Sequence, residues 1–299
     1  MLVAVESIYA WQWPVDPPVF SGAFGDNTGE GFRKGDLLRS SGAAVGSVAP
    51  GQVIFAYQRD QRADALPSGL GNFVVIQHRQ DFRSVYDHLA PGSIPLRLTD
   101  VIEGQTVGLS GESGNIEQPG VGLQILDIKR KRAVNPVAVL PPVADQRPPT
   151  ITGAYLFDAA KFALTDGVAV PTGHWAVAAE ISEHSQGGKV PDLTAPFGIE
   201  LSVNDKIVTK LQFEYLVFRQ DHYYIDPDYR WRFENLYLGP HTYDLGMIDL
   251  VPGMNTVKIR TFDFAGNESV LQQQVFYGQA AVGPSESASG VPTGTARSP

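Results

Sequence analysis

Two neighbouring segments decide the fold of the first half of the chain: GNFVVIQH at residues 71–78 and YDHL at residues 86–89. Branched and aromatic side chains dominate the first segment, and this pattern predicts a buried strand over Asn72 to His78. Polar and apolar residues alternate from Arg83 to Leu89, as expected for an antiparallel partner strand. Together the two segments predict the centre of an antiparallel sheet.

Further short strands flank this pair on both sides. The dipeptide Pro50-Gly51 predicts a turn between two of them, and glycines separate the others. No stretch of ten or more residues in this half has helical periodicity, so we expect an all-β domain built of antiparallel strands. The other strand candidates lie at residues 45–49, 52–56, 101–108 and 122–129.

The second half has the same pattern of short strands separated by turns. Residues 264–268 predict a hairpin turn between strands at 258–262 and 270–276, because Gly266 and Asn267 suit backbone with positive φ. This half is similar to bacterial immunoglobulin-like domains, which implies a β-sandwich. The remaining strand candidates lie at residues 151–157, 175–181, 198–203, 208–215, 247–250 and 256–263.

Proline marks the boundary between the halves. Residues 141–149 contain four prolines, which fix φ and predict a stiff, extended linker. The last residues are rich in Gly, Ser, Ala and Pro, which predicts disorder. The predicted order is an N-terminal segment at 1–13, a first domain at 14–140, the linker, a β-sandwich at 150–278 and a disordered tail at 279–299.

The N-terminal segment has two interpretations. Residues 7–10 resemble the end of an export signal, in which case Met1 is a misplaced start and residues 1–13 are a signal-peptide remnant. In the other interpretation the segment is an ordinary strand. The first interpretation predicts a periplasmic or otherwise exported protein of the cell envelope.

Charge and cysteine content exclude several classes of function. The chain has 23 Lys+Arg against 32 Asp+Glu and a net charge of -9, whereas binding to nucleic-acid phosphates needs a basic face. The absence of cysteine excludes disulfides, thiol nucleophiles and cysteine-based zinc sites. No apolar run approaches the roughly 18–20 residues of a membrane span. We therefore expect neither nucleic-acid binding nor a membrane span.

Residues 14–140 resemble the LytM/lysostaphin-type zinc metallopeptidases, which cut peptidoglycan cross-links. The segments at 71–78 and 86–89 carry the strongest part of the resemblance. Other segments follow the order of the family: FRKG at 32–35, GAAVGSVAPGQV at 42–53, GQTVG at 104–108, Ser113-Gly114 and Asn135-Pro136. The resemblance implies an antiparallel, barrel-like sheet with a substrate groove on its face.

In that family three side chains bind a catalytic zinc ion and two further histidines assist. The ligand positions correspond here to Arg33, Leu37 and Gln124, and the assisting positions to His88 and Gly122. Leu37 offers no ligand atom, Gln124 is a poor neutral ligand and Arg33 carries a permanent positive charge. Only His88 is retained among the five positions. We therefore expect no metal, no cofactor and no catalytic residue at this site.

The groove without zinc has two interpretations. In the first, Arg33 binds a carboxylate of a peptidoglycan stem peptide or a partner protein, with Gln124 and His88 as hydrogen-bonding neighbours. In the second, Arg33 forms a structural ion pair with Asp36 or Asp87. Asp36 adjoins a ligand position, but a shift of one residue on a strand points its carboxylate to the other face.

The resemblance extends to the degenerate LytM-type domains that activate cell-wall amidases without zinc ligands of their own. It implies a catalytically inactive homologue that binds peptidoglycan or a cell-wall hydrolase. The alternative is an active peptidoglycan metalloendopeptidase with a non-standard metal site. Whether the chain is an enzyme stays open on the sequence alone, with an inactive protein favoured.

One aromatic stretch has no counterpart in this resemblance. Residues 221–241 include four tyrosines and Trp231. They form either an exposed aromatic binding loop or hydrophobic plugs that close one end of the sandwich.

Overall fold

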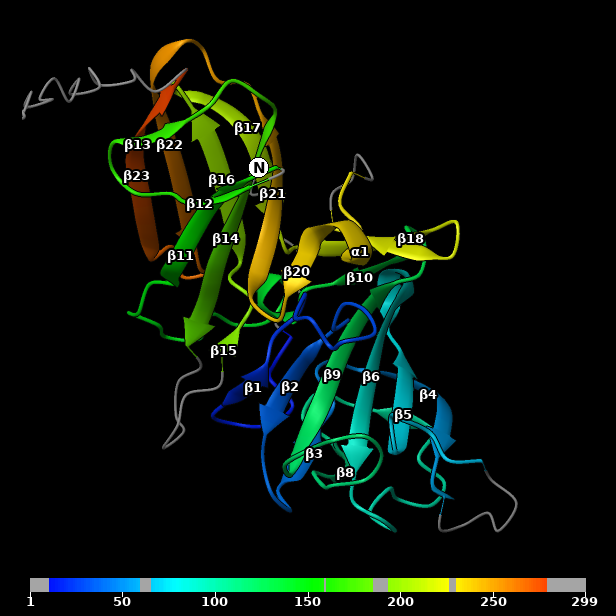
Figure 1. The fold of residues 1–299 in the computed structure, drawn as a ribbon. Coiled ribbons are helices and arrows are strands. Elements are labelled where there is room, and N and C mark those ends of the chain that lie inside the picture. The colour runs from blue at the N-terminus through cyan, green and yellow to red at the C-terminus, as the bar shows by residue number, and fades with distance from the viewer. Residues whose placement is uncertain (1–10, 60–65, 159, 185–192, 226–229, 279–299) are drawn as a thin grey trace, which may run out of the picture.

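The computed structural model describes residues 11–59, 66–158, 160–184, 193–225 and 230–278, and within these ranges the chain is built almost entirely of β-strands (Figure 1). The predicted all-β class is therefore confirmed. Most of the predicted N-terminal segment (residues 1–10) and the predicted tail at 279–299 lie outside the described residues. Within the described ranges, no helix is long and apolar enough to cross a membrane.

A ten-stranded sheet forms the lower part of Figure 1. Its strands follow the order β19-β18-β10-β9-β6-β5-β4-β7, and β2 pairs with β9 while β1 pairs with β2. A 3₁₀ turn at Arg79–Asp81 connects β5 to β6, and another at Pro136–Ala138 follows β10. A separate two-stranded sheet consists of β3 (Ala44–Gly46) and β8 (Thr106–Leu109). The strands of the large sheet are β1 (Phe20–Gly22), β2 (Asp36–Arg39), β4 (Gly51–Tyr57), β5 (Asn72–Gln77), β6 (Phe82–Leu89), β7 (Asp100–Val101), β9 (Gly120–Asp127), β10 (Arg132–Val134), β18 (Tyr215–Arg219) and β19 (His222–Tyr224).

The central strands of this sheet bury alternate side chains. On β5, Val74 and Ile76 are fully buried while their neighbours are half-buried, as the period of two requires. Strand β6 pairs antiparallel with both β5 and β9, so the predicted strand pair is confirmed. Tyr86 of β6 is fully buried, and its hydroxyl accepts a 2.8 Å hydrogen bond from the backbone N–H of Val48.

The second half contains two sheets that share one apolar core. One sheet has the order β12-β11-β14-β21-β20, with β15 paired to β14, and the other has the order β13-β23-β22-β16-β17. The predicted hairpin is present as β22 and β23. The strands are β11 (Thr150–Phe157), β12 (Lys161–Ala163), β13 (Val168–Val170), β14 (Trp175–His184), β15 (Leu193–Thr194), β16 (Gly198–Val203), β17 (Lys206–Gln212), β20 (Tyr237–Gly239), β21 (Thr242–Ile248), β22 (Gly253–Phe262) and β23 (Glu268–Tyr277).

One hairpin of the second half belongs to the sheet of the first. Strand β18 pairs antiparallel with β10, placing Ala133 opposite Leu216, and β19 extends the sheet by one more strand. The side chain of Asn135 strengthens the junction, because its Nδ2 donates a 2.7 Å hydrogen bond to the carbonyl oxygen of Phe213. Backbone pairing thus joins the two halves in addition to the proline-rich linker.

Apolar packing accompanies this pairing. Phe24 and Phe32 of the first half are buried in the same core as Phe213 and Leu236 of the second. Gly25 makes the contact possible, since a Cβ atom there would lie 2.2 Å from Cδ1 of Phe213. Its φ of 92° also suits glycine far better than other residues.

The aromatic stretch packs into this junction where the structure describes it. Trp231 is buried, and the short helix α1 (Phe233–Leu236) places Phe233 edge-on to Phe32 with ring centroids 5.5 Å apart. Tyr237 contacts Phe32 at a centroid distance of 5.9 Å. These contacts favour the interpretation as hydrophobic plugs. The rings pack at the junction between the halves, against Phe32 of the first half, in addition to the sandwich. Residues 226–229 lie outside the described residues.

The junction predicts different costs for two glycine substitutions in one loop. Gly25→Ala adds both positive-φ strain and a clash with Phe213, and we expect it to lower the free energy of unfolding by roughly 2–4 kcal/mol. Gly29→Ala, also at positive φ but with no atom within 4 Å of the added Cβ, is the control and should cost about 1 kcal/mol. Urea denaturation measures both, and equal losses would contradict the packing argument.

Candidate functional site

The five positions identified from the sequence lie around the middle of strand β9. Gly122 of β9 pairs with Leu37 of β2 on one side and with Asp87 of β6 on the other. These three residues therefore form one row across the sheet. Gln124 lies two residues further along β9 and faces the same way, because side chains alternate along a strand. The structure thus brings together Leu37, Gly122, Gln124 and Asp87, the residue before His88.

The carboxylate of Asp87 occupies the centre of this site. Gln124 Nε2 donates a 3.1 Å hydrogen bond to Asp87 Oδ2. A Cβ atom at Gly122 would lie 1.7 Å from Asp87 Oδ1, so the carboxylate lies where a side chain at position 122 would begin. Asp87 is 3% exposed, and this burial raises the pKa of its carboxyl.

Sequence reasoning assigned no role to Asp87 except as a partner of Arg33. A signal was present, because Asp87 precedes the retained His88 and Gly122 replaces the first residue of the family's histidine pair. Only the strand register shows that these two positions are opposite each other. The space left by the absent side chain at Gly122 is therefore filled by the carboxylate of Asp87.

His88 is held by its backbone and by both ring nitrogens. Its Nδ1 lies 2.8 Å from the carbonyl oxygen of Ser113, which fixes Nδ1 as the donor. Its Nε2 lies 3.4 Å from Asp87 Oδ1, and its φ of 62° is in the left-handed region. The imidazole is thereby turned toward Asp87.

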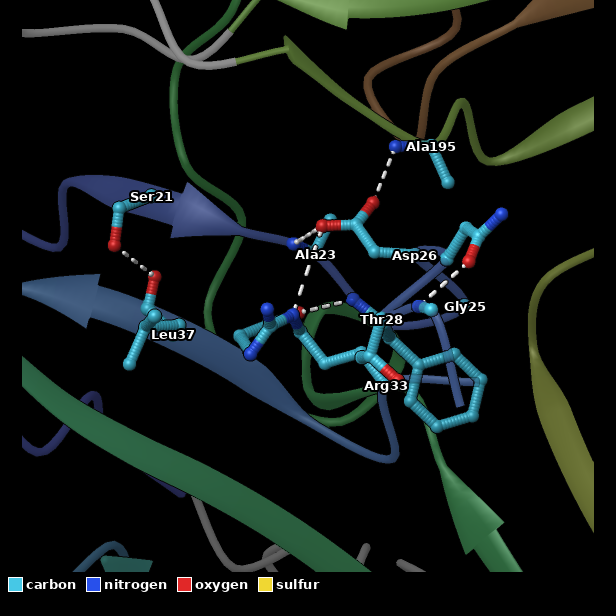
Figure 2. Close-up of polar contacts among 12 residues, drawn as sticks. Ser21, Ala23, Gly25, Asp26, Thr28, Arg33, Leu37 and Ala195 are labelled. Carbon is cyan, nitrogen blue, oxygen red and sulfur yellow. Dashed lines mark hydrogen bonds and ion pairs between the residues drawn. The ribbon is translucent and has the colours of Figure 1, made fainter. Parts of the chain in front are cut away.

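Arg33 lies at the edge of the site and forms its ion pair with Asp26 (Figure 2). Its Nε is 3.7 Å from Asp26 Oδ2, and its side chain is 31% exposed. The backbone N–H of Arg33 also donates a 2.8 Å hydrogen bond to the carbonyl oxygen of Asp26. The guanidinium charge also acts on Asp36 and Asp87, where it lowers the pKa against the larger effect of burial.

Asp26 links Arg33 to the second half of the chain (Figure 2). Its Oδ2 accepts a 2.7 Å hydrogen bond from the backbone N–H of Ala23, and its Oδ1 accepts a 2.6 Å hydrogen bond from that of Ala195. Burial raises the pKa of Asp26, while these bonds and Arg33 favour its charged form. The position of Arg33 therefore depends on a contact between the two halves.

Asp36 is buried at 2% exposure, away from the row formed by Leu37, Gly122 and Asp87. Its Oδ1 accepts a 2.9 Å hydrogen bond from the backbone N–H of Phe24, and its Oδ2 has no hydrogen-bond partner. Burial raises its pKa to about 7. The carboxylate of Asp36, next to the ligand position Leu37, is thus bound to the backbone of Phe24 and not part of the site.

The residues present do not fit a catalytic zinc ion. Leu37 and Gly122 contribute no donor atom, and Arg33 brings a positive charge. Gln124 already donates to Asp87. Among the described residues, no three His, Cys, Asp or Glu side chains are grouped so that they could hold a metal ion.

Comparison with known families identifies the first domain. The model of peptidase family M23 matches residues 32–136, which contain all five positions. The first domain of this chain belongs to peptidase family M23. A second family model, which carries no description, matches residues 148–276. The immunoglobulin-like character of the second half stays a prediction.

Curated relatives match the same part of the chain. An uncharacterized protein of Treponema pallidum is 31% identical over 114 residues, which cover 35% of this chain and 78% of that protein. Murein hydrolase activator NlpD of Salmonella dublin is 32% identical over 135 residues, or 45% of this chain and 32% of NlpD. Outer membrane antigenic lipoprotein B of Haemophilus influenzae is 30% identical over 142 residues, which cover 47% of this chain and 32% of that protein. The chain therefore spans about a third of the length of the last two relatives.

Solved structures give a weaker likeness. A zinc-containing peptidase from Vibrio cholerae is 25% identical, with 39% of this chain and 36% of that chain covered and a TM-score of 0.33. The assignment to the M23 family therefore depends on the family model and the curated relatives.

The fit between Asp87 and Gly122 predicts strong coupling between these positions. Gly122→Ala alone should lower the free energy of unfolding by roughly 2–4 kcal/mol, because the carboxylate must move. The same substitution in an Asp87→Ala background should cost much less. Gly108→Ala, whose added Cβ would meet flexible side-chain atoms of Leu89 and Ser93 at 3.1 and 3.3 Å, is the strand control. Additive losses in urea denaturation would contradict the account.

Buried Asp36 predicts a pH dependence of stability. Its pKa is about 7 in the folded protein against an ordinary value of 3.8, so the native state binds more protons than the unfolded chain between these values. The free energy of unfolding should therefore fall as pH rises from about 4 to 7. Asp36→Asn keeps the acceptor for Phe24 and should flatten this part of the profile. The exposed Asp100→Asn should leave it unchanged, and a steeper profile in the Asp36 variant would contradict the prediction.

Proposed function

We propose that the first domain is a catalytically inactive member of the M23 family that acts as a regulatory binding module at the bacterial cell wall. The observation that carries the proposal is the Asp87 carboxylate against Gly122, with Gln124 as its hydrogen-bond donor. A histidine cannot replace Gly122 without displacing that carboxylate. The domain therefore retains the sheet of a peptidase and lacks the groups that activate water.

The favoured action is activation of a cell-wall hydrolase. Support comes from the curated relatives, since NlpD of Salmonella dublin is named a murein hydrolase activator and matches this domain at 32% identity. The name of the Haemophilus influenzae relative, an outer membrane lipoprotein, supports a location in the cell envelope. Binding of peptidoglycan itself is compatible with the same groove.

Arg33 is the side chain through which the groove would recognise a carboxylate. It is about one-third exposed, and its ion pair with Asp26 at 3.7 Å is long enough for a second anion to compete. Gln124 and His88 face the same region but are engaged by Asp87 and Ser113. Recognition of an acidic group on peptidoglycan or on the hydrolase would therefore depend chiefly on Arg33.

The alternative function is a metalloendopeptidase with a non-standard site. At the five-position site, Asp87 and His88 offer an ionisable oxygen and a ring nitrogen 3.4 Å apart, beside Gln124, which is a poor neutral ligand. Two donors fall short of the three protein ligands that a catalytic zinc normally has. This candidate would need a ligand from outside the site.

A dye-release assay on labelled peptidoglycan sacculi tests the proposal. The purified chain alone should release no dye, with or without added Zn²⁺, and should raise the rate of a purified cell-wall amidase severalfold. Release by the chain alone that EDTA abolishes would establish the alternative. Absence of both stimulation and co-sedimentation with sacculi would overturn the binding role.

Two arginine variants sharpen this assay. Arg33→Ala should weaken stimulation or sacculus binding, whereas Arg97→Ala, an exposed arginine on another loop, should not. Thermal unfolding of both variants verifies that they are folded. Equal effects of the two substitutions would assign Arg33 a purely structural role.

A further inference from the structure

A cavity of about 130 Å³ lies at the junction of the two halves, and none of the five positions of the candidate site lines it. Both halves contribute to it: Phe20 and Phe24 from the first, and Phe197 and Phe264 from the second. The exposed residues Ala144 and Ala265 also line it, so the cavity reaches the protein surface there. An apolar cavity of roughly 150 Å³ holds a molecule of the size of benzene, so this cavity suits a ligand of a few carbon atoms.

Two carboxyl groups in the lining have an oxygen atom without a partner. Asp36 is 2% exposed, and its Oδ2 is buried without a hydrogen bond. Glu183 Oε1 accepts a 2.9 Å hydrogen bond from the backbone N–H of His184, whereas its Oε2 is buried without a partner. Buried polar atoms in proteins are normally paired, and these two unpaired oxygens belong to residues that line the same cavity.

The surroundings of the cavity are negative. Asp145 and Asp263 also line it, and no lysine or arginine does so among the described residues. Burial, assisted by the charges of Asp145 and Asp263, raises the pKa of Glu183 to about 7, against the lowering effects of the His184 N–H bond and Arg147. An unpaired carboxylate in such surroundings is costly, and a bound cation would offset that cost.

The cation that fits is organic. Among the described residues no three carboxylates or imidazoles are grouped as a calcium or zinc site would need. The aromatic and proline side chains of the lining favour an apolar body instead. An ammonium group on a short hydrocarbon chain satisfies both conditions.

We propose that this cavity binds a primary ammonium group carried on a short apolar chain, with Glu183 as its acceptor and the other carboxyls of the lining supplying negative charge. Two sources share this chemistry, a free alkylamine and the lysine side chain of a partner protein. The proposal is independent of the groove around Arg33.

Saturation-transfer NMR at pH 8 with the full chain tests the proposal, using n-butylammonium as the probe and n-butanol as its uncharged analogue. At this pH both carboxyls are largely ionised and the amine is protonated. We expect saturable binding of butylammonium and none of butanol. Equal binding of both, or displacement of butylammonium by equimolar Ca²⁺ or Zn²⁺, would overturn the proposal.

Variants locate the binding. Glu183→Gln should weaken butylammonium binding by roughly 10-fold, because it removes the charge and keeps the shape. Glu103→Gln, an exposed glutamate outside the cavity lining, makes the same change of charge and should have no effect. Ala144→Phe at the exposed rim should also block binding while leaving every carboxyl in place. Wild-type affinity in both the Glu183 and Ala144 variants would overturn the proposal.

A second probe identifies the source. Nα-acetyl-lysine methylamide carries the same ammonium group on a peptide-like unit. Affinity equal to or above that of butylammonium would support recognition of a lysine side chain. Binding of butylammonium alone would support a free amine.

Discussion

A carboxylate can lie against the middle of strand β9 only where residue 122 has no side chain. Asp87 Oδ1 lies within 1.7 Å of the place where a Cβ atom at Gly122 would be. The other features of the site follow from this contact: Gln124 donates to the carboxylate, and His88 is turned toward it. Four of the five positions that match the zinc and catalytic positions of the family thus surround or adjoin one buried acid, to which Gln124 donates a hydrogen bond.

The second half of the chain contributes to the environment of this site. Strand β18 continues the M23 sheet beyond β10, and the buried carboxylate of Asp26 joins the backbone of Ala195 to the guanidinium of Arg33. Arg33 is therefore positioned by contacts from both halves. A partner that binds near Arg33 would therefore lie beside contacts that join the two halves. A ligand in the junction cavity would lie close to Asp36, which is on strand β2 next to Leu37.

Much of the first domain follows from local sequence. The strand pair at 72–77 and 82–89 can be predicted because its partners are close in sequence, as can the hairpin of β22 and β23 in the second half. The five family positions can be identified because their residue types are poor metal ligands. The addition of β18 and β19 to the first sheet is invisible locally, since Ala133 and Leu216 are far apart in the chain. The same limit applies to Asp87 and Arg33. The role of Asp87 follows only from its pairing with Gly122 on the neighbouring strand. Arg33 forms its ion pair with Asp26, a partner that the sequence analysis did not predict.

The zinc content of the purified full chain tests the central claim most directly. After incubation with excess Zn²⁺ and removal of free metal, elemental analysis should find far less than one zinc per chain, and a His88→Ala variant should retain the same amount. One zinc per chain in the wild type, lost in the His88 variant, would contradict the account.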